Sequence, residues 1–179
     1  MKRLTFLSGL LLICAYSFAQ SFTQIVKVVA ADRAVSDRFS KSVAISGNYA
    51  IIGAHRVASD ANGNNPLPQA GAAYIFEKTA GTWVQVQKIT AAGRAAEDNF
   101  GTSVAISGNT AIVGAYKRDE PNSQGDTLRQ VGAVYIFEKD TGGDWQEVQK
   151  LLAPDMDSLN YFGKSVAISG DYLIAGAAF

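Results

Sequence analysis

One six-residue string, Ser-Val-Ala-Ile-Ser-Gly, occurs three times in this chain without a single change. The copies begin at Ser42, Ser103 and Ser165, so the spacings are 61 and 62 residues. Exact recurrence at a nearly fixed period indicates a repeat architecture, in which each unit buries its apolar face against its neighbours. A residue present in every copy is therefore expected to build the unit, and function is expected where the copies differ.

The repeat extends well beyond this string. Residues 71–78 match 132–139, and residues 83–89 match 145–151. Residues 22–30 are a further, upstream copy of that last segment. The recurring aromatic and glycine positions, which we interpret as structural, are Phe39, Phe100, Phe162, Gly53, Gly114, Gly176, Tyr74 and Tyr135.

The recurring segments have the character of β-strands. They are short, rich in β-branched and aromatic residues, and bounded by Gly, Asn, Asp and Pro. In the first full repeat they predict strands at 42–46, 49–54, 72–78 and 83–90. Four antiparallel strands in about 60 residues make one blade of a β-propeller, so the expected fold class is all-β.

The order of the segments predicts an incomplete propeller. Blade units start near residues 39, 100 and 162, and a fourth-strand copy at 22–30 precedes them. This arrangement gives about two full and two partial blades, whereas a propeller needs about 4–8 blades. We therefore expect the remaining blades from a longer chain or from assembly with other chains.

Residues 1–19 have the features of a secretory signal peptide. Lys2 and Arg3 precede an apolar stretch too short for a membrane span, and a small-x-small cleavage site ends at Ala19. Cys14 could be a lipoprotein cysteine, but Ile13 before it is too bulky for that processing. We expect residues 20–179 to be exported, as a secreted, periplasmic or cell-surface propeller.

Charge and cysteine content exclude several classes of partner. The chain has 16 basic and 16 acidic residues, and removal of Lys2 and Arg3 leaves a formal charge of −2. No basic stripe indicates nucleic acid, and no mature segment is apolar enough to span a membrane. Cys14 is the only cysteine, so the mature chain has no thiol chemistry.

The pairs Phe100-Gly101 and Phe162-Gly163, each followed by a Gly-Ala pair, resemble the FG-GAP repeat. That repeat forms the seven-bladed propeller of integrin alpha chains and of many bacterial exported proteins. The first copy departs from the pattern, because Ser40 follows Phe39. The position after Gly-Ala also departs, since it is never Pro; its occupants are His55, Tyr116 and Ala178.

The resemblance also implies calcium loops between the first and second strands of several blades. Here those junctions are Gly47-Asn48, Gly108-Asn109 and Gly170-Asp171, which indicate two-residue hairpin turns. So tight a turn cannot surround a cation that takes 6–8 oxygen ligands. We therefore expect no metal and no cofactor at these junctions.

Two long connections, 56–70 and 117–131, differ in sequence between otherwise matched repeats and are the better candidates for function. They are expected on the same face as the links 91–99 and 153–161, the face that the integrin-type resemblance associates with ligands. Calcium sites here would lack the Gly and late Glu of the EF-hand pattern, so solvated loops are the simpler interpretation. The candidate residues are Asp60, Asn62, Asn64, Lys117, Arg118, Asp119 and Asp126.

Catalysis is not expected. His55 is the only histidine, and no nucleophile elbow, phosphate loop or metal-spaced cluster occurs. The predicted inner strand, Ser-Val-Ala-Ile-Ser, offers only small and apolar groups. The leading hypothesis is an exported, non-catalytic propeller that binds an extracellular protein or glycan, as in adhesion. The alternative is an accessory propeller of a larger secreted enzyme whose catalytic domain lies outside this chain.

Overall fold

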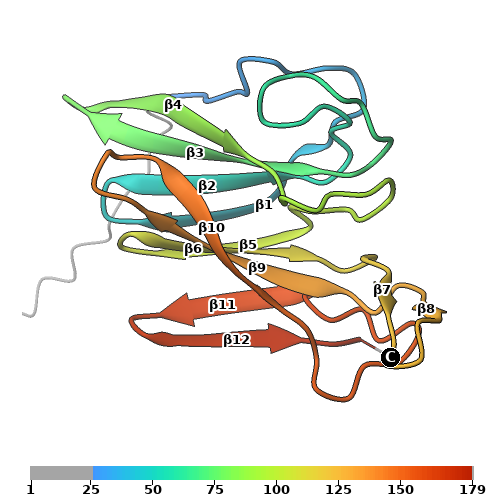
Figure 1. The fold of residues 1–179 in the computed structure, drawn as a ribbon. Helices are drawn as coiled ribbons and strands as arrows, with labels where there is room; N and C mark the ends of the chain where they lie inside the picture. The colour runs from blue at the N-terminus through green and yellow to red at the C-terminus, as the bar shows by residue number, and fades with distance from the viewer. Residues whose placement is uncertain (1–25, 179) are drawn as a thin grey trace, which may run out of the picture.

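The computed structural model describes residues 26–178, and their regular structure is antiparallel β-sheet (Figure 1). The first sheet has its strands in chain order, each paired with the next. Its members are β1 (Phe39–Ser46), β2 (Tyr49–Ala54), β3 (Ala72–Thr79) and β4 (Thr82–Ile89).

The second sheet repeats this plan with β5, β6, β9 and β10 in sequence order. A two-stranded hairpin, β11 with β12, begins the next unit, and a short hairpin, β7 with β8, lies in the connection between β6 and β9. The bounds are β5 (Ser103–Ser107), β6 (Thr110–Ala115), β7 (Glu120–Pro121), β8 (Thr127–Leu128), β9 (Ala133–Lys139), β10 (Trp145–Leu151), β11 (Ser165–Ser169) and β12 (Tyr172–Gly176).

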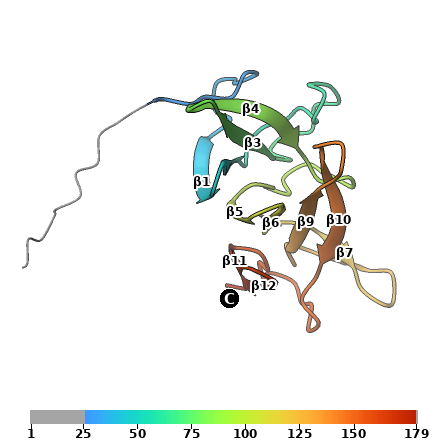
Figure 2. The ribbon, with the colours of Figure 1, turned by 90° about the vertical axis from the view of Figure 1, so that its left-hand side faces the viewer.

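These sheets are successive blades of a propeller. In Figure 2 the first strands β1, β5 and β11 follow one another along one side, and the outer strands β4 and β10 lie on the opposite side. The prediction of an all-β fold built from four-stranded antiparallel blades is therefore confirmed. The described residues form an arc of two full blades and a hairpin, which does not close into a ring.

The first and second strands of each blade are joined by a tight turn. Ser46 pairs with Tyr49, which leaves Gly47 and Asn48 as the two central residues. Gly47 has φ 55°, whereas Asn48 keeps negative φ, the pattern of a type II′ turn with glycine first. Gly108 and Gly170 have the same φ of 55°, so the thrice-repeated string ends at the same turn in every copy.

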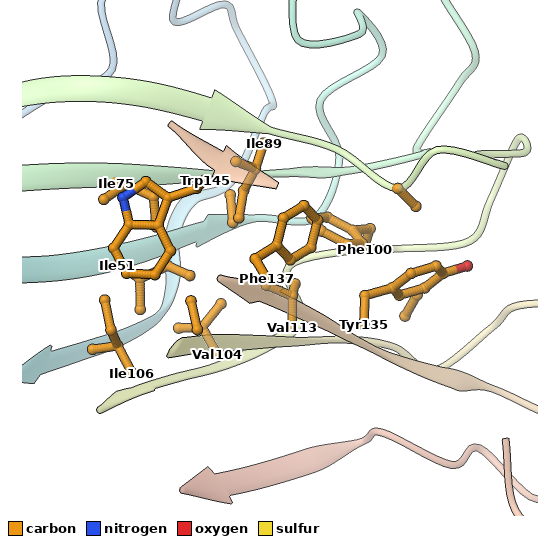
Figure 3. Close-up of a cluster of buried hydrophobic side chains, with 14 of the residues drawn as sticks. Ile51, Ile75, Ile89, Phe100, Val104, Ile106, Val113, Tyr135, Phe137 and Trp145 are labelled. Carbon is orange, nitrogen blue, oxygen red and sulfur yellow. The ribbon is translucent and has the colours of Figure 1, made fainter. Parts of the chain in front are cut away.

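The largest buried cluster lies between the first two blades. Ile51 and Ile75 of the first sheet pack against Val104 and Ile106 of the second, and Trp145 closes one end of the cluster (Figure 3). All five side chains are at most 7% exposed. Blade-to-blade burial thus supplies the core, as expected for a repeat protein.

A close backbone contact fixes the spacing between these blades. The carbonyl oxygen of Gly101, in the second blade, accepts a hydrogen bond of 2.9 Å from Ser42 Oγ of the first blade. A Cβ added to Gly53 would lie 2.0 Å from that carbonyl oxygen and 2.4 Å from Ser42 Oγ. Only glycine at position 53 lets the carbonyl approach so closely.

We call the contact between two successive blades a joint, and the joint between the second and third units repeats this contact. Ser103 Oγ donates to the Gly163 carbonyl at 2.6 Å, and a Cβ on Gly114 would lie 2.0 Å from the same oxygen. The recurring Ser, Phe-Gly and Gly-Ala positions therefore form one backbone contact that docks each blade against the next. Ser40 occupies the position of Gly101 and Gly163, and it is exposed because no blade precedes it among residues 26–178.

The structure differs from the sequence expectation in two places. Residues 26–30, the described part of the predicted strand 22–30, form no strand, because no third strand is present beside them to supply a hydrogen-bonded partner. β1 begins at Phe39, before the predicted boundary at Ser42, and a bulge separates the two positions. The predicted signal peptide, 1–19, lies outside the described residues. Among residues 26–178, no helix has the length and apolar character of a membrane span.

We expect Phe100→Ala to lower the free energy of unfolding by about 3–5 kcal/mol, as for a buried aromatic side chain. Phe100 is 1% exposed and makes edge-on contacts with Tyr135 and Phe137. Phe39, its half-buried counterpart in the first blade, provides the control, and Phe39→Ala should cost clearly less. Urea unfolding followed by the fluorescence of Trp83 and Trp145 measures both losses, and equal losses would contradict the prediction.

The joint can be tested with one methyl group. Gly53→Ala should destabilise the chain by about 3 kcal/mol, the upper end for overpacking, because the obstructing atoms include a backbone carbonyl. Gly93→Ala is the matched control, since no atom lies within 4 Å of its added Cβ, and it should change stability by less than about 0.5 kcal/mol. Thermal unfolding of the two variants decides the matter; a Gly53→Ala chain as stable as the control would refute the close contact.

Candidate functional site

The long connections and the inter-blade links form one continuous surface, which we call the loop face: residues 56–70, 91–99, 117–131 and 153–161. Each connection is hydrogen-bonded to the link that follows its blade. The Glu97 amide donates to the Pro68 carbonyl at 2.8 Å, and the Asn99 amide donates to the Gln69 carbonyl at 3.0 Å. The same ladder recurs one joint later, where the Leu159 amide donates to the Arg129 carbonyl at 2.9 Å.

Asp60 organises the first long connection. Its Oδ1 accepts hydrogen bonds of 2.9 Å from the amides of Asn62 and Asn64, and its Oδ2 accepts one of 2.7 Å from Asn65 Nδ2. The Asn64 amide contributes most to holding the pKa of Asp60 below its ordinary value. These bonds form an Asx turn, so the Asp60 carboxylate is occupied within its own loop.

The second connection contains the same turn with different residues. Asn122 Oδ1 accepts the amides of Gln124 and Asp126 at 3.0 and 2.9 Å, and the Asp126 carbonyl accepts the Asn122 amide at 2.8 Å. Asp119, also in this connection, accepts the Gln130 amide at 2.7 Å. The two connections therefore share a backbone plan that their sequences conceal.

Arg118, predicted as a ligand-face residue, belongs to a buried ionic network. Its Nη1 lies 3.0 Å from Asp98 Oδ2 and its Nε lies 2.9 Å from Glu120 Oε1. Lys150 Nζ, from β10, lies 2.5 Å from the same Glu120 oxygen. The network joins the link, the connection and the outer strand, so Arg118 holds the loop face together.

The two carboxylates of this network respond differently to burial. Burial raises the pKa of Asp98 above its ordinary value, against the lowering effects of the Ala95 amide and Arg118. Burial also opposes ionisation of Glu120, but hydrogen bonds from Lys150 and Arg118 outweigh it and lower its pKa. Two cations beside one carboxylate explain the difference.

The first blade has a simpler counterpart. Lys88 Nζ, at the position equivalent to Lys150, lies 2.7 Å from Asp32 Oδ2 and 2.8 Å from Ser59 Oγ. Val57, 2% exposed, stands where the second blade has Arg118. The ionic network is therefore a property of one blade and not of the repeat.

The candidate residues do not converge on one cavity. Asp60 and Asn62 line a hollow of about 360 Å³ beside Arg94. Lys117 and Asp119 line a separate hollow of about 100 Å³. Asn64 and Asp126 line neither hollow, although their backbone amides belong to the two Asx turns. The loop face thus presents two shallow polar sites along the arc.

His55 and its counterpart Tyr116 lie at the inner end of the loop face. Burial and then the charge of Lys41 depress the pKa of His55 to about 4, with further contributions from Arg56, Arg38 and Lys117. His55 is therefore neutral at pH 7. Among residues 26–178, no group of three or more His, Cys, Asp or Glu side chains is arranged to hold a metal ion.

Signals for the ionic network in the sequence are weak. Asp98 has a counterpart in Asp37, and Lys150 has one in Lys88. In the sequence, however, Asp98 and Lys150 are more than 50 residues apart, and so are Asp37 and Lys88. Folding places Arg118 between Asp98 and Glu120, and Lys150 reaches the same glutamate from β10. Pairings of this kind depend on tertiary contact, so spacing alone does not reveal them.

The FG-GAP repeat model matches residues 22–76, 83–137 and 145–179. These matches cover most of the chain, and the chain belongs to the FG-GAP repeat family, as the Phe-Gly and Gly-Ala pairs predicted. Each complete match runs from a fourth-strand position to a third strand, so sequence repeats and blades are out of phase. A search of curated proteins gives no significant match.

The ionic network supports a double-mutant test. Arg118→Met should cost about 3 kcal/mol of unfolding free energy, because Asp98 and Glu120 remain buried with less compensating charge. Asp98→Asn should then cost less in the Arg118→Met background than in the parent chain, with a coupling of about 1–3 kcal/mol. Chemical unfolding of the parent, both single variants and the double variant measures the coupling; strictly additive losses would show that the two side chains do not interact.

Proposed function

We propose that this FG-GAP propeller module is exported and non-catalytic, and that its loop face binds an extracellular protein or glycan in adhesion at the cell surface. The observation that carries the proposal is that the blades are nearly identical from repeat to repeat, whereas the long connections differ. The blades repeat the same strands and joints, whereas the two long connections present different side chains on the same backbone plan.

The distribution of side chains supports binding rather than catalysis. The Ser-Val-Ala-Ile-Ser segment that β1, β5 and β11 share provides no carboxylate, imidazole or thiol along the inner side, and Lys41 in β1 is the one titratable side chain of these three strands. The carboxylates of Asp60 and Asp98 are occupied by structural hydrogen bonds. A rigid frame that presents variable polar loops is the usual arrangement of a recognition module.

The Asn62 and Asn64 side chains are the best probes of this proposal. Both residues are exposed, and their backbone amides, not their side chains, bond to Asp60. Replacement by alanine therefore changes the surface of the loop without removing its Asx turn. Asn48 and Asn109 are also exposed and lie in the hairpin turns at the opposite end of the strands, so they provide a matched pair.

The mature chain is to be screened on an array of glycans and purified extracellular proteins, and the dissociation constant for the retained probe measured by biolayer interferometry. Asn62→Ala with Asn64→Ala should weaken binding at least about fivefold, a loss of roughly 1 kcal/mol. Asn48→Ala with Asn109→Ala should leave it unchanged. EDTA should not alter binding or the melting temperature, because the hairpin turns are too tight to surround a cation.

Three results would count against the proposal. The first is that the mature chain binds no component of the array. The second is an equal loss of affinity in both asparagine double variants, which would show that the loop face does not contact the ligand. The third is turnover of a retained glycan by the mature chain, which would show that the module is catalytic.

A further inference from the structure

Five basic side chains gather beside the loop face, at its inner edge. We call this edge the inner rim: it consists of the residues around the start of the first strand and the end of the second strand of each blade. They come from all three blade units. They are Arg38, Lys41, Arg56, Lys117 and Lys164.

Backbone hydrogen bonds bring three of these residues together in the first blade. The Lys41 amide donates to the Arg38 carbonyl at 3.2 Å, which closes a turn at the start of β1. The Arg56 amide, just beyond β2, donates at 3.2 Å to the carbonyl of Asp37, the residue before Arg38. The turn and the end of β2 therefore hold three cationic side chains at one corner of the blade.

The other two cations continue the rim over the next two units. The Lys117 amide donates to the Asp98 carbonyl at 3.3 Å, the same bond that Arg56 makes one blade earlier. Lys164 Nζ lies 3.9 Å from the centre of the Tyr116 ring, and Lys117 Nζ lies 5.8 Å from the same centre. The Tyr161 ring lies 5.8 Å from that of Tyr116, so two tyrosines accompany these cations.

Among the described residues, none of the five cations has a carboxylate within ion-pair distance. Glu97 and Asp119 line the same hollow as Lys117, whereas the carboxylates of Asp37 and Asp98 are occupied elsewhere. Asp37 Oδ2 accepts the Ala34 amide at 2.6 Å, and Asp98 Oδ2 accepts the Ala95 amide and pairs with Arg118. A concentration of like charge opposes folding, and a local conflict of this kind is typical of a functional surface.

His55 reports the resulting electrostatic field. Burial contributes most to the lowered pKa of His55, and the charges that follow it in size are cations of the rim: Lys41, Arg56, Arg38 and Lys117. The mature chain as a whole has a small excess of acidic residues, so this positive region results from placement and not from composition.

We propose that the inner rim binds an acidic polysaccharide, with its carboxylate or sulfate groups against the rim cations of successive blades. The proposal deepens the proposed function and rests on it. Cations that recur from blade to blade match a ligand whose anionic groups recur along a chain, whereas a single small anion could contact only one corner. The rings of Tyr116 and Tyr161 add apolar surface against which sugar rings can pack.

The test compares two double variants that remove the same charge from the same residue type. Lys41→Gln with Lys164→Gln removes two exposed rim cations. Lys27→Gln with Lys78→Gln removes two exposed lysines that lie outside the rim. Binding of the parent chain and both variants to immobilised heparin, a sulfated probe, and to polygalacturonate, a carboxylate probe, is measured as a function of salt concentration.

We expect the parent to bind at least one of these two probes and the rim variant to lose at least about tenfold in affinity at 0.1 M salt. The slope of log affinity against log salt should fall by about two for the rim variant, one for each lost contact. The matched variant should retain its affinity within about twofold, because the probe would not contact its lysines. Far-ultraviolet circular dichroism and melting temperature check that both variants remain folded.

Several outcomes would overturn the inference. Equal losses in both variants would indicate attraction by overall charge, and equally tight binding of polyglutamate or of phosphatidylserine vesicles would indicate an unselective anion surface. Binding of neither polysaccharide would also refute it. Retention of a neutral glycan or a protein on the array, unaffected by Lys41→Gln with Lys164→Gln, would refute the rim site while leaving the proposed function intact.

Discussion

The distance between blades depends on one backbone carbonyl. The oxygen of Gly101 sits against Gly53 and accepts the Ser42 hydroxyl, and the same three-part contact recurs one joint later. A side chain at the Gly53 position would collide with that oxygen. The apolar side chains of two neighbouring sheets can meet, as Figure 3 shows for Ile51 and Val104, only because the backbones approach so closely at this point. Dense packing between blades thus follows from a glycine and a serine.

This joint also explains which parts of the repeat are free to vary. Positions that dock blades are constrained on both sides, whereas the connections 56–70 and 117–131 need only return the chain from the second strand to the third. Each connection is nevertheless tied to the following link by backbone hydrogen bonds that any sequence can make. Side chains can therefore change without loss of the frame, which is the property that a recognition surface requires.

The loop face contains two electrostatic arrangements with different consequences. Around Asp98 and Arg118, opposite charges are buried together, and their hydrogen bonds hold a link, a connection and an outer strand in place. Around His55, like charges gather at the surface, and none of these five cations forms an ion pair among the described residues. The first arrangement stabilises the fold; the second opposes it locally and leaves positive charge available to a ligand. The ionic network lies within the second blade and the link that precedes it, whereas the group of cations draws on residues from three successive units.

Much of this architecture was accessible from the sequence. The strands, their turns and the family follow from local pattern, since alternation, turn glycines and exact recurrence act over a few residues. The sequence does not reveal the contacts of the candidate residues: Arg118 joins a link to a connection, and the Asp60 carboxylate accepts hydrogen bonds from its own loop, while their roles toward a ligand stay a prediction. Charged loop residues look alike in a sequence whether they bind solvent, a ligand or a distant partner, so spacing could not separate these roles.

The sequence by itself determined the repeat, its all-β character and the positions where glycine is indispensable, because these depend on backbone conformation and on identity between copies. Only the tertiary structure decided which residues meet across a joint. Asp98 reaches Arg118 because the link packs beside the connection of the blade that follows it, and Lys164 reaches Tyr116 because docking brings neighbouring units together. The grouping of cations on the inner rim arises in the same way, since the net charge of a chain does not specify where its charges lie after folding.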